Sequence, residues 1–205
     1  RLLASLETEG AVEQLEAGGG YAIGETLAVL GASNNPTAGL RSTVRPFIEE
    51  LAMVSRGSAG FTVLEGDTAY WVDNVDHGDE LVTLADQTGQ TFPLHTIPSG
   101  VAILSKFTLD EFERYLSVDR LWPDGTSIDQ EVLRRRIADI GPSGIVASNE
   151  EIDAGVNAFA APFRGMDGAW TGAIYLQGPS FRFPEEGDEP RIVQLVCDAA
   201  ERLSQ

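Results

Sequence analysis

The stretch at residues 144–179 limits what this chain can fold into more than any other part of the sequence. Its residues, GIVASNEEIDAGVNAFAAPFRGMDGAWTGAIYLQGP, predict a strand, an acidic loop and a hairpin that closes on Asp167-Gly168, a pair that tolerates positive backbone angles. Upstream, PLHTIPSGVAIL at residues 93–104 places Ser99 and Gly100 at the opening of an apolar helix. A strand, a loop, a hairpin and a helix start in this layout favour a pocket that binds a small molecule.

The other segments of the chain are also either hairpins or helices. A hairpin at residues 60–75 turns at Gly66-Asp67, and apolar residues recur at helical spacing over residues 43–56 and 191–203. Strands joined by two-residue turns, with helices grouped between them, are typical of an α+β fold. We therefore expect a mainly antiparallel sheet flanked by helices.

Two helix starts carry the signature of a capping box, in which a side chain and a backbone N–H satisfy each other reciprocally. One is Thr108 with Glu111, and the other is Ser127 with Gln130. Both pairs predict that a helix begins at the residue that follows the Thr or Ser.

The first 32 residues read differently from the rest. A helical pattern stops at Gly10, two short apolar runs at residues 11–15 and 20–23 flank a glycine-rich turn, and a further helix is expected at residues 25–30. The segment SNNPTAG at residues 33–39 is rich in helix breakers and marks a linker or an interrupted helix. The sequence thus predicts an N-terminal segment, residues 1–32, and a main domain, residues 33–205.

Charge and cysteine content exclude several classes of protein. The chain has 32 Asp and Glu residues against 14 Lys and Arg residues, and such a surface repels nucleic acid phosphates. The single cysteine, Cys197, cannot form an intramolecular disulfide, and no run of about 20 apolar residues predicts a membrane span. These features predict a reduced, cytoplasmic setting without a membrane partner.

Signatures of catalysis are absent from the sequence. It contains no nucleophile elbow, zinc-protease motif, P-loop or dinucleotide fingerprint. The carboxylates around His77 could hold a hard cation, but their spacing matches no known calcium loop, so a solvated hairpin end is expected there. The sequence predicts no catalytic residue, no metal and no cofactor.

Several motifs, in order and correctly spaced, resemble the effector-binding domain of the isocitrate-lyase-regulator (IclR) family of bacterial transcription factors. The motifs that carry this resemblance are RPFIEEL at residues 45–51, PLH at 93–95, SGVAIL at 99–104, Gly144 with NEE at 149–151, GVNAFAAP at 155–162, DG at 167–168, QGP at 177–179 and FRF at 181–183. The resemblance covers nearly all of residues 43–205. It implies a GAF-like, ligand-sensing domain and no enzyme activity.

Residues 1–32 are similar to another part of the same family. They resemble the end of the recognition helix, the wing and the linker helix of a winged helix-turn-helix, whose earlier helices are absent. The resemblance implies that the full-length protein binds operator DNA as a homodimer or a tetramer, and that a small-molecule effector modulates this binding. The alternative is an enzyme or a cofactor sensor on the same GAF-like scaffold, because a fold does not fix a function.

The resemblance also locates a pocket. It implies that the ligand-binding residues come from the loop and helix start, the strand end and the later strands, namely Thr96, Ile97, Pro98, Ser99, Gly100, Ser148, Ala158, Tyr175 and Gln177. Phe61 and Trp71 on the first hairpin are expected to add an aromatic wall. Backbone N–H groups near Ser99 and Gly100, at the positive end of a helix dipole, suit a carboxylate.

Some of these positions depart from the family's pattern. In its sensors of small keto acids, an Asp matches Ser148, a Cys matches Ala158, and serines match Tyr175 and Gln177. These differences point away from glyoxylate and pyruvate. Our hypothesis is an aromatic or larger organic acid, held by the amides near Ser99 and by Ser148, and the alternative is that Tyr175 fills the cavity.

Overall fold

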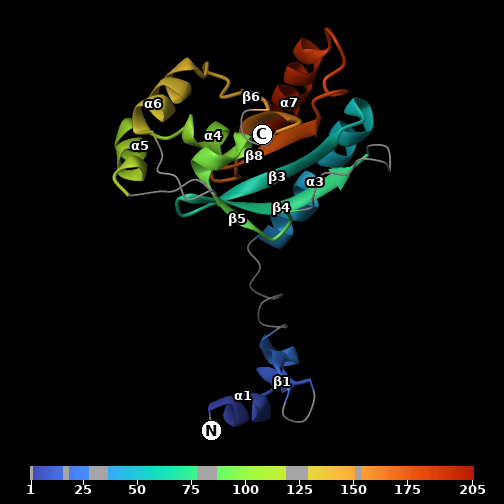
Figure 1. Cartoon of the computed structure of the whole chain (residues 1–205), viewed down its shortest axis with the longest axis vertical. Coiled ribbons are helices and arrows are strands. Elements are labelled where there is room, and N and C mark those ends of the chain that lie inside the picture. The colour runs from blue at the N-terminus through green and yellow to red at the C-terminus, as the bar shows by residue number, and fades with distance from the viewer. Residues whose placement is uncertain (1, 16–18, 28–36, 78–86, 119–128, 151–153) are drawn as a thin grey trace. The chain divides into compact units, whose positions relative to one another are not determined.

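The chain divides into two compact units, residues 1–40 and residues 41–205 (Figure 1). The structure, a computed structural model, describes residues 2–15, 19–27, 37–77, 87–118, 129–150 and 154–205. The division between the units falls within helix α3 (Thr37–Ser55), a few residues after the predicted boundary at residues 32 and 33.

The first unit contains a helix followed by an antiparallel hairpin. Its elements are α1 (Leu2–Thr8), β1 (Val12–Gln14) and β2 (Tyr21–Ile23). Gly10 follows the helix at a φ of 66°, and the Thr26 hydroxyl donates to the Glu9 carbonyl at 2.9 Å. The predicted helix and hairpin are present, whereas residues 28–30 lie outside the described residues. Membership of this unit in a winged helix stays a prediction.

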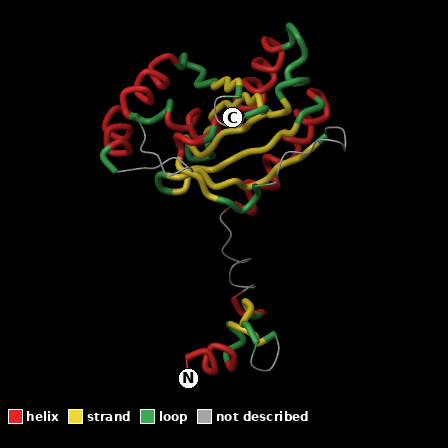
Figure 2. The backbone as a smooth tube through the Cα atoms, viewed as in Figure 1, coloured by secondary structure: helices red, strands yellow, loops and turns green. Residues whose placement is uncertain are grey.

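The second unit is built on a six-stranded sheet with the order β5-β4-β3-β8-β7-β6 (Figure 2). Its strands are β3 (Ser58–Glu65), β4 (Thr68–Asp76), β5 (Thr91–Pro93), β6 (Val146–Asn149), β7 (Val156–Arg164) and β8 (Trp170–Pro179). Every neighbouring pair is antiparallel, which confirms the predicted type of sheet. Strands β3 and β8, far apart in sequence, lie side by side at the centre.

Helices cover both faces of this sheet. Besides α3, they are η1 (Leu94–Thr96), α4 (Pro98–Leu104), α5 (Leu109–Leu116), α6 (Gln130–Asp139) and α7 (Glu189–Leu203). Both α4 and α7 pack against β7 and β8. Ala173 and Tyr175 on β8 share a core with α4, so by strand alternation the buried Ile174 and Leu176 face the opposite side, toward α7. None of the described helices combines the length and apolarity that a membrane span requires.

Strands β3 and β4 are interrupted by a bulge that decides which side chains share a face. The register shifts between Phe61 and Thr62, so that Phe61 lies opposite Asp73 while Thr62 lies opposite Trp71. Directly opposed residues of antiparallel strands point to the same side of the sheet. Phe61 and Trp71 therefore point to different faces, because the bulge inserts one extra residue, Val72, on β4.

One of the two predicted capping boxes forms as expected. The Thr108 backbone N–H donates to Glu111 Oε2 at 2.7 Å, and the Glu111 N–H donates to Thr108 Oγ1 at 3.3 Å. Helix α6, however, is capped by Asp129, whose carboxylate accepts from the second and third N–H groups of the helix. The prediction of Ser127 as this cap was wrong because the sequence offers two suitable side chains within three residues.

Helix α3 is anchored to the sheet through a buried carboxylate. Asp73 on β4 is only 2% exposed, and it accepts hydrogen bonds from Arg41 at 3.0 Å and from Arg45 at 3.1 Å. Burial alone would raise the pKa of Asp73, but the hydrogen bonds and charges of the two arginines outweigh it and lower that pKa. The ion pairs thus stabilise the folded state while Asp73 is ionised.

Replacing Asp73 by Asn should lower the free energy of unfolding at neutral pH by about 1–3 kcal/mol, because two charge-assisted hydrogen bonds lose their negative partner. Since the folded pKa of Asp73 lies below the unfolded one, the wild-type advantage is complete above the unfolded pKa and disappears as the pH falls through the folded pKa. Chemical denaturation from about pH 7 to pH 3 measures this difference.

The matched control is Glu49→Gln, which breaks the exposed Arg45–Glu49 pair on the same helix. An exposed pair of this kind contributes less than about 0.5 kcal/mol. An advantage of wild type over Asp73→Asn that grows as the pH falls would contradict the role given to Asp73.

Candidate ligand-binding site

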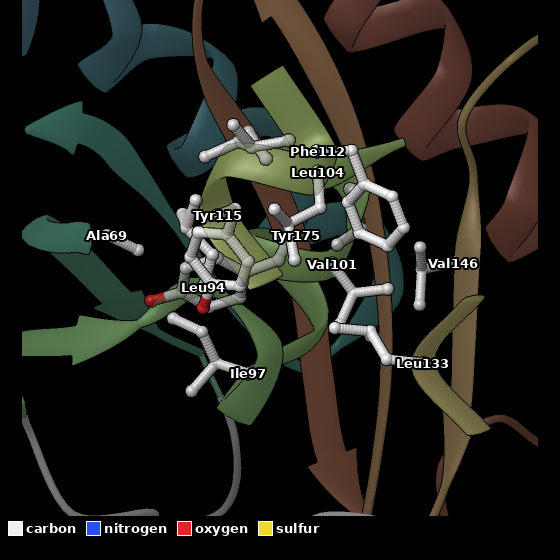
Figure 3. Packing of buried hydrophobic residues seen from close by; sticks show 14 of the residues in the cluster. Ala69, Leu94, Ile97, Val101, Leu104, Phe112, Tyr115, Leu133, Val146 and Tyr175 are labelled. Atoms are coloured by element: carbon white, nitrogen blue, oxygen red, sulfur yellow. The ribbon is translucent and has the colours of Figure 1, made fainter. Parts of the chain in front are cut away.

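The floor of the candidate site is a hydrophobic core between α4, α5, α6 and the sheet. Figure 3 shows its side chains converging from these elements, among them Leu94, Ile97, Val101, Leu104, Phe112, Tyr115, Leu133 and Val146. Helix α4 lies directly on the η1 turn because residue 100 is a glycine. A Cβ at Gly100 would overlap the backbone of Leu94. The missing side chain of Gly100 therefore lets the backbone of η1 lie against α4.

The η1 turn is fixed by a buried pair of polar rings. His95 Nδ1 lies 2.7 Å from the Tyr115 hydroxyl, and the His95 backbone N–H lies 3.2 Å from the same oxygen. Both residues are almost fully buried. The pair holds the turn in place just before α4, and this in turn positions Pro98 and Ser99 at the start of the helix.

A cavity of about 30 Å³ lies where the start of α4 meets the sheet. It is lined by Trp71, Gln87, Ile97, Pro98, Ser99, Ser148, Val156, Ala158, Tyr175 and Gln177. The fold thus brings together eight of the residues that the sequence assigned to a pocket. Their role in binding stays a prediction.

Two lining residues, Gln87 and Val156, were not predicted. Val156 lies two residues before Ala158 on β7, so strand alternation places both side chains on one face and could have identified it. Gln87 lies in the segment between β4 and β5, where no periodic pattern points to the cavity.

Three of the predicted residues do not line this cavity. Thr96 donates its hydroxyl to the Pro93 carbonyl at 2.8 Å, inside the η1 turn. Gly100 packs against η1 as described above. Phe61 contacts Phe163, with 6.4 Å between the ring centroids, on the other face of the sheet, which it shares with Ile174 opposite it on β8.

Tyr175 is buried in the core that α4 shares with the sheet. Its ring stands edge-on to Trp71 with 4.9 Å between centroids, and its hydroxyl donates to Asn74 Oδ1 at 2.9 Å. Ser58 donates to the same Asn74 oxygen at 3.1 Å. A Cβ at position 60 would overlap the Tyr175 hydroxyl. Gly60 therefore provides the room for this phenol.

The lining of the cavity is mainly apolar, with a few polar groups and no charged side chain among the described residues. Trp71 is 7% exposed, and its indole N–H finds no acceptor within the described residues. An indole can only donate, whereas the hydroxyls of Ser99 and Ser148 and the amide of Gln177 can donate or accept. This inventory suits a ligand that presents hydrogen-bond acceptors.

A larger hollow of about 520 Å³ lies elsewhere, between the end of α3 and the start of α7. Its lining carries side chains of both signs, among them Arg56, Arg182, Arg191, Asp76, Glu185 and Asp188. Arg191 is already bonded to Asp188 at 2.6 Å. Charged side chains of both signs select no single class of ligand, so size alone does not make this hollow the better candidate.

The acidic group around His77 provides no metal site in the described part of the chain. Its member Asp73 points to Arg41 and Arg45 instead of a cation, and Asp79 and Glu80 lie outside the described residues. Among the described residues, no three His, Cys, Asp or Glu side chains are grouped to hold a metal ion.

The cavity thus lies under a helix start on a helix-covered antiparallel sheet of an α+β domain. Residues 36–205 match the family described as "Bacterial transcriptional regulator IclR C-terminal". The chain therefore belongs to the IclR family of transcriptional regulators, as its motifs implied.

Comparisons with known proteins agree with this membership. The glycerol operon regulatory protein of Streptomyces griseus is 28% identical over 205 residues, which cover 99% of this chain and 80% of that protein. This relative is named as a regulator, in agreement with the prediction that the chain is not an enzyme.

Solved structures share the fold. The IclR-type regulator from Silicibacter sp. TM1040 superimposes with a TM-score of 0.80 at 23% identity, covering 100% of this chain and 80% of that one. An IclR homologue from Microbacterium hydrocarbonoxydans, solved in complex with 4-hydroxybenzoate, gives a TM-score of 0.79 at 24% identity, covering 100% and 82%.

Replacing Gly60 by Ala should destabilise the chain by about 1–3 kcal/mol, because the new methyl group overlaps the Tyr175 hydroxyl and the Asp73 carbonyl. In a Tyr175→Ala background the same change should cost less, since one of the two overlaps is gone. A double-mutant cycle of denaturation midpoints measures this coupling.

Gly141→Ala is the matched control for this prediction, because nothing lies within 4 Å of a Cβ at that position. The control should change the free energy of unfolding by less than about 0.5 kcal/mol. If Gly60→Ala were equally mild, the packing described around Tyr175 would be wrong.

Proposed function

We propose that this chain is the effector-sensing part of an IclR-type transcriptional regulator and that the cavity beside α4 binds a small organic acid. In this proposal the acid modulates the binding of operator DNA by the full-length protein, a homodimer or a tetramer that works in the cytoplasm. The winged-helix character of residues 1–32 belongs to the same proposal, because that segment would connect the sensor to DNA.

The observation that carries this proposal is the buried indole N–H of Trp71. Trp71 lines the cavity, and its N–H has no acceptor among the described residues. A buried donor without a partner costs about 1–3 kcal/mol. A ligand whose acceptor reached this N–H would recover this free energy, which is a physical reason for a ligand to bind here.

A carboxylate is the acceptor group that best suits the lining. Besides the Trp71 indole, Ser99, Ser148 and Gln177 bring groups that can donate hydrogen bonds, and they come from three further elements. No acidic side chain lines the cavity among the described residues, so an anion would meet no like charge there. These features favour an organic acid over a cationic ligand.

The size of the acid depends on Tyr175. With the phenol in place, the cavity of about 30 Å³ has room for a group of a few heavy atoms. An aromatic acid, the class expected from the sequence and the class bound by the Microbacterium homologue as 4-hydroxybenzoate, would need the Tyr175 ring to move.

Helix α3 offers a route from the cavity toward the first unit. The Tyr175 hydroxyl bonds to Asn74, and the neighbouring Asp73 holds Arg41 and Arg45 of α3. Since α3 begins at Thr37, a change at Tyr175 would reach this helix through two adjacent residues of β4. A ligand acts in this way only if it binds two arrangements of the protein with different affinity.

Filling the cavity should abolish effector binding. In a thermal-shift panel of carboxylic acids, we expect at least one acid to raise the melting temperature of the chain, because binding stabilises the folded state by mass action. Ser148→Leu should lower the affinity for that acid by more than about tenfold, which corresponds to roughly 1.4 kcal/mol, because the larger side chain occupies the cavity.

The matched control is Ala147→Leu on the same strand. Ala147 is exposed whereas Ser148 is buried, so the same new side chain should leave binding unchanged there. The proposal would be wrong if no acid in the panel stabilised the wild-type chain, or if Ser148→Leu bound the acid as tightly as Ala147→Leu.

A further inference from the structure

We propose that Tyr175 is the size-determining residue of the cavity. Its phenol occupies the place that the ring of an aromatic acid would take, so the wild-type chain selects acids of a few heavy atoms over ring-bearing ones. This inference rests on the proposed function and names the class of ligand that the same site would accept.

The surroundings of Tyr175 fit a phenol at each of its parts. The Trp71 ring stands edge-on to the Tyr175 ring, with 4.9 Å between the ring centroids, and Asn74 Oδ1 accepts from the Tyr175 hydroxyl at 2.9 Å. Gly60 leaves space where any side chain would collide with that hydroxyl. The side chain is 3% exposed. Trp71, Asn74 and Gly60 together form a subsite for a phenol. In the wild-type chain this subsite is filled by Tyr175.

The volume that remains is small. A cavity needs about 10–15 Å³ to hold one water molecule, and an apolar cavity of about 150 Å³ holds benzene. The cavity beside Tyr175 measures about 30 Å³, which is much closer to the volume needed for a water molecule than to the volume that holds benzene. A ring can therefore enter only where the Tyr175 ring now lies.

An exchange of rings gives an aromatic acid little advantage. It would have to expel the Tyr175 ring from its place against Trp71 and from the Asn74 oxygen, and its own ring would then pack against the same two residues. The acid would thus replace one set of interactions by another of the same kind. The binding-competent state would also be sparsely populated, which reduces apparent affinity. A short acid binds beside Tyr175 without this exchange.

Phenol itself is the direct probe of the subsite. Tyr175→Ala should bind phenol at least tenfold more tightly than wild type does, measured by calorimetry and by the rise in melting temperature with phenol concentration. Tyr175→Val provides a second opening of the same subsite, with a β-branched residue suited to a strand.

Two controls separate the subsite from a general loosening of the core. Tyr175→Phe keeps the ring and should exclude phenol as wild type does. Tyr70→Ala removes a half-buried tyrosine from strand β4, which β3 separates from β8, and should create no phenol site. The inference would be overturned if phenol bound to none of the folded variants among Tyr175→Ala and Tyr175→Val.

The acid arm of the experiment compares benzoate with propionate. Benzoate should bind to Tyr175→Ala at least tenfold more tightly than to wild type, while propionate should gain no such advantage from the substitution. Benzoate that bound wild type as tightly as Tyr175→Ala would contradict the inference. The phenol arm needs neither a carboxylate nor DNA, so its failure counts against Tyr175, whereas failure of every acid on wild type counts against the proposed function.

Discussion

The contact between helix α4 and the η1 turn is the constraint on which the candidate site depends. Gly100 lets the helix lie directly on the backbone of Leu94, and the His95–Tyr115 pair fixes that turn. A side chain at position 100 would lift the helix from η1. Pro98 and Ser99 would then leave the cavity that they now line together with β4, β6, β7 and β8.

Opposite this helix, the sheet contributes a wall that depends on the register of β3. Gly60 lies opposite both Asn74 and Tyr175, so the smallest residue faces the largest one where the three strands meet. The same strand β4 carries Asp73, which faces α3 and its arginines. Strand β4 therefore carries, next to each other, Asn74, which accepts from the Tyr175 hydroxyl, and Asp73, which anchors α3.

Much of this architecture could be predicted from the sequence because it rests on local signals. Turn pairs such as Asp167-Gly168, the helical spacing of apolar residues over residues 191–203, and the capping box at Thr108 each depend on a few neighbouring residues. The family's motifs also identified most of the residues around the cavity. The motifs did not show on which face of the sheet each side chain lies.

The failures share a physical cause, which is that side-chain direction depends on partners far away in sequence. Phe61 and Trp71 were expected on one wall, yet the bulge on β4 sends them to different faces. Gly100 was expected among the residues that line the pocket, yet it packs against the Leu94 backbone. The sequence likewise names Tyr175 as a cavity residue without showing that Gly60 and Asn74 hold its phenol inside.

The indole N–H resonance of Trp71 offers the most direct measurement of whether this cavity binds the effector. In a ¹⁵N-labelled chain, with Trp71→Phe used for assignment, titration with a stabilising acid should shift that resonance far more than those of the other two of the three tryptophans. A hydrogen bond to the acid is the expected cause. An acid that stabilises the chain and leaves the Trp71 resonance in place would contradict the assignment of this cavity as the effector site.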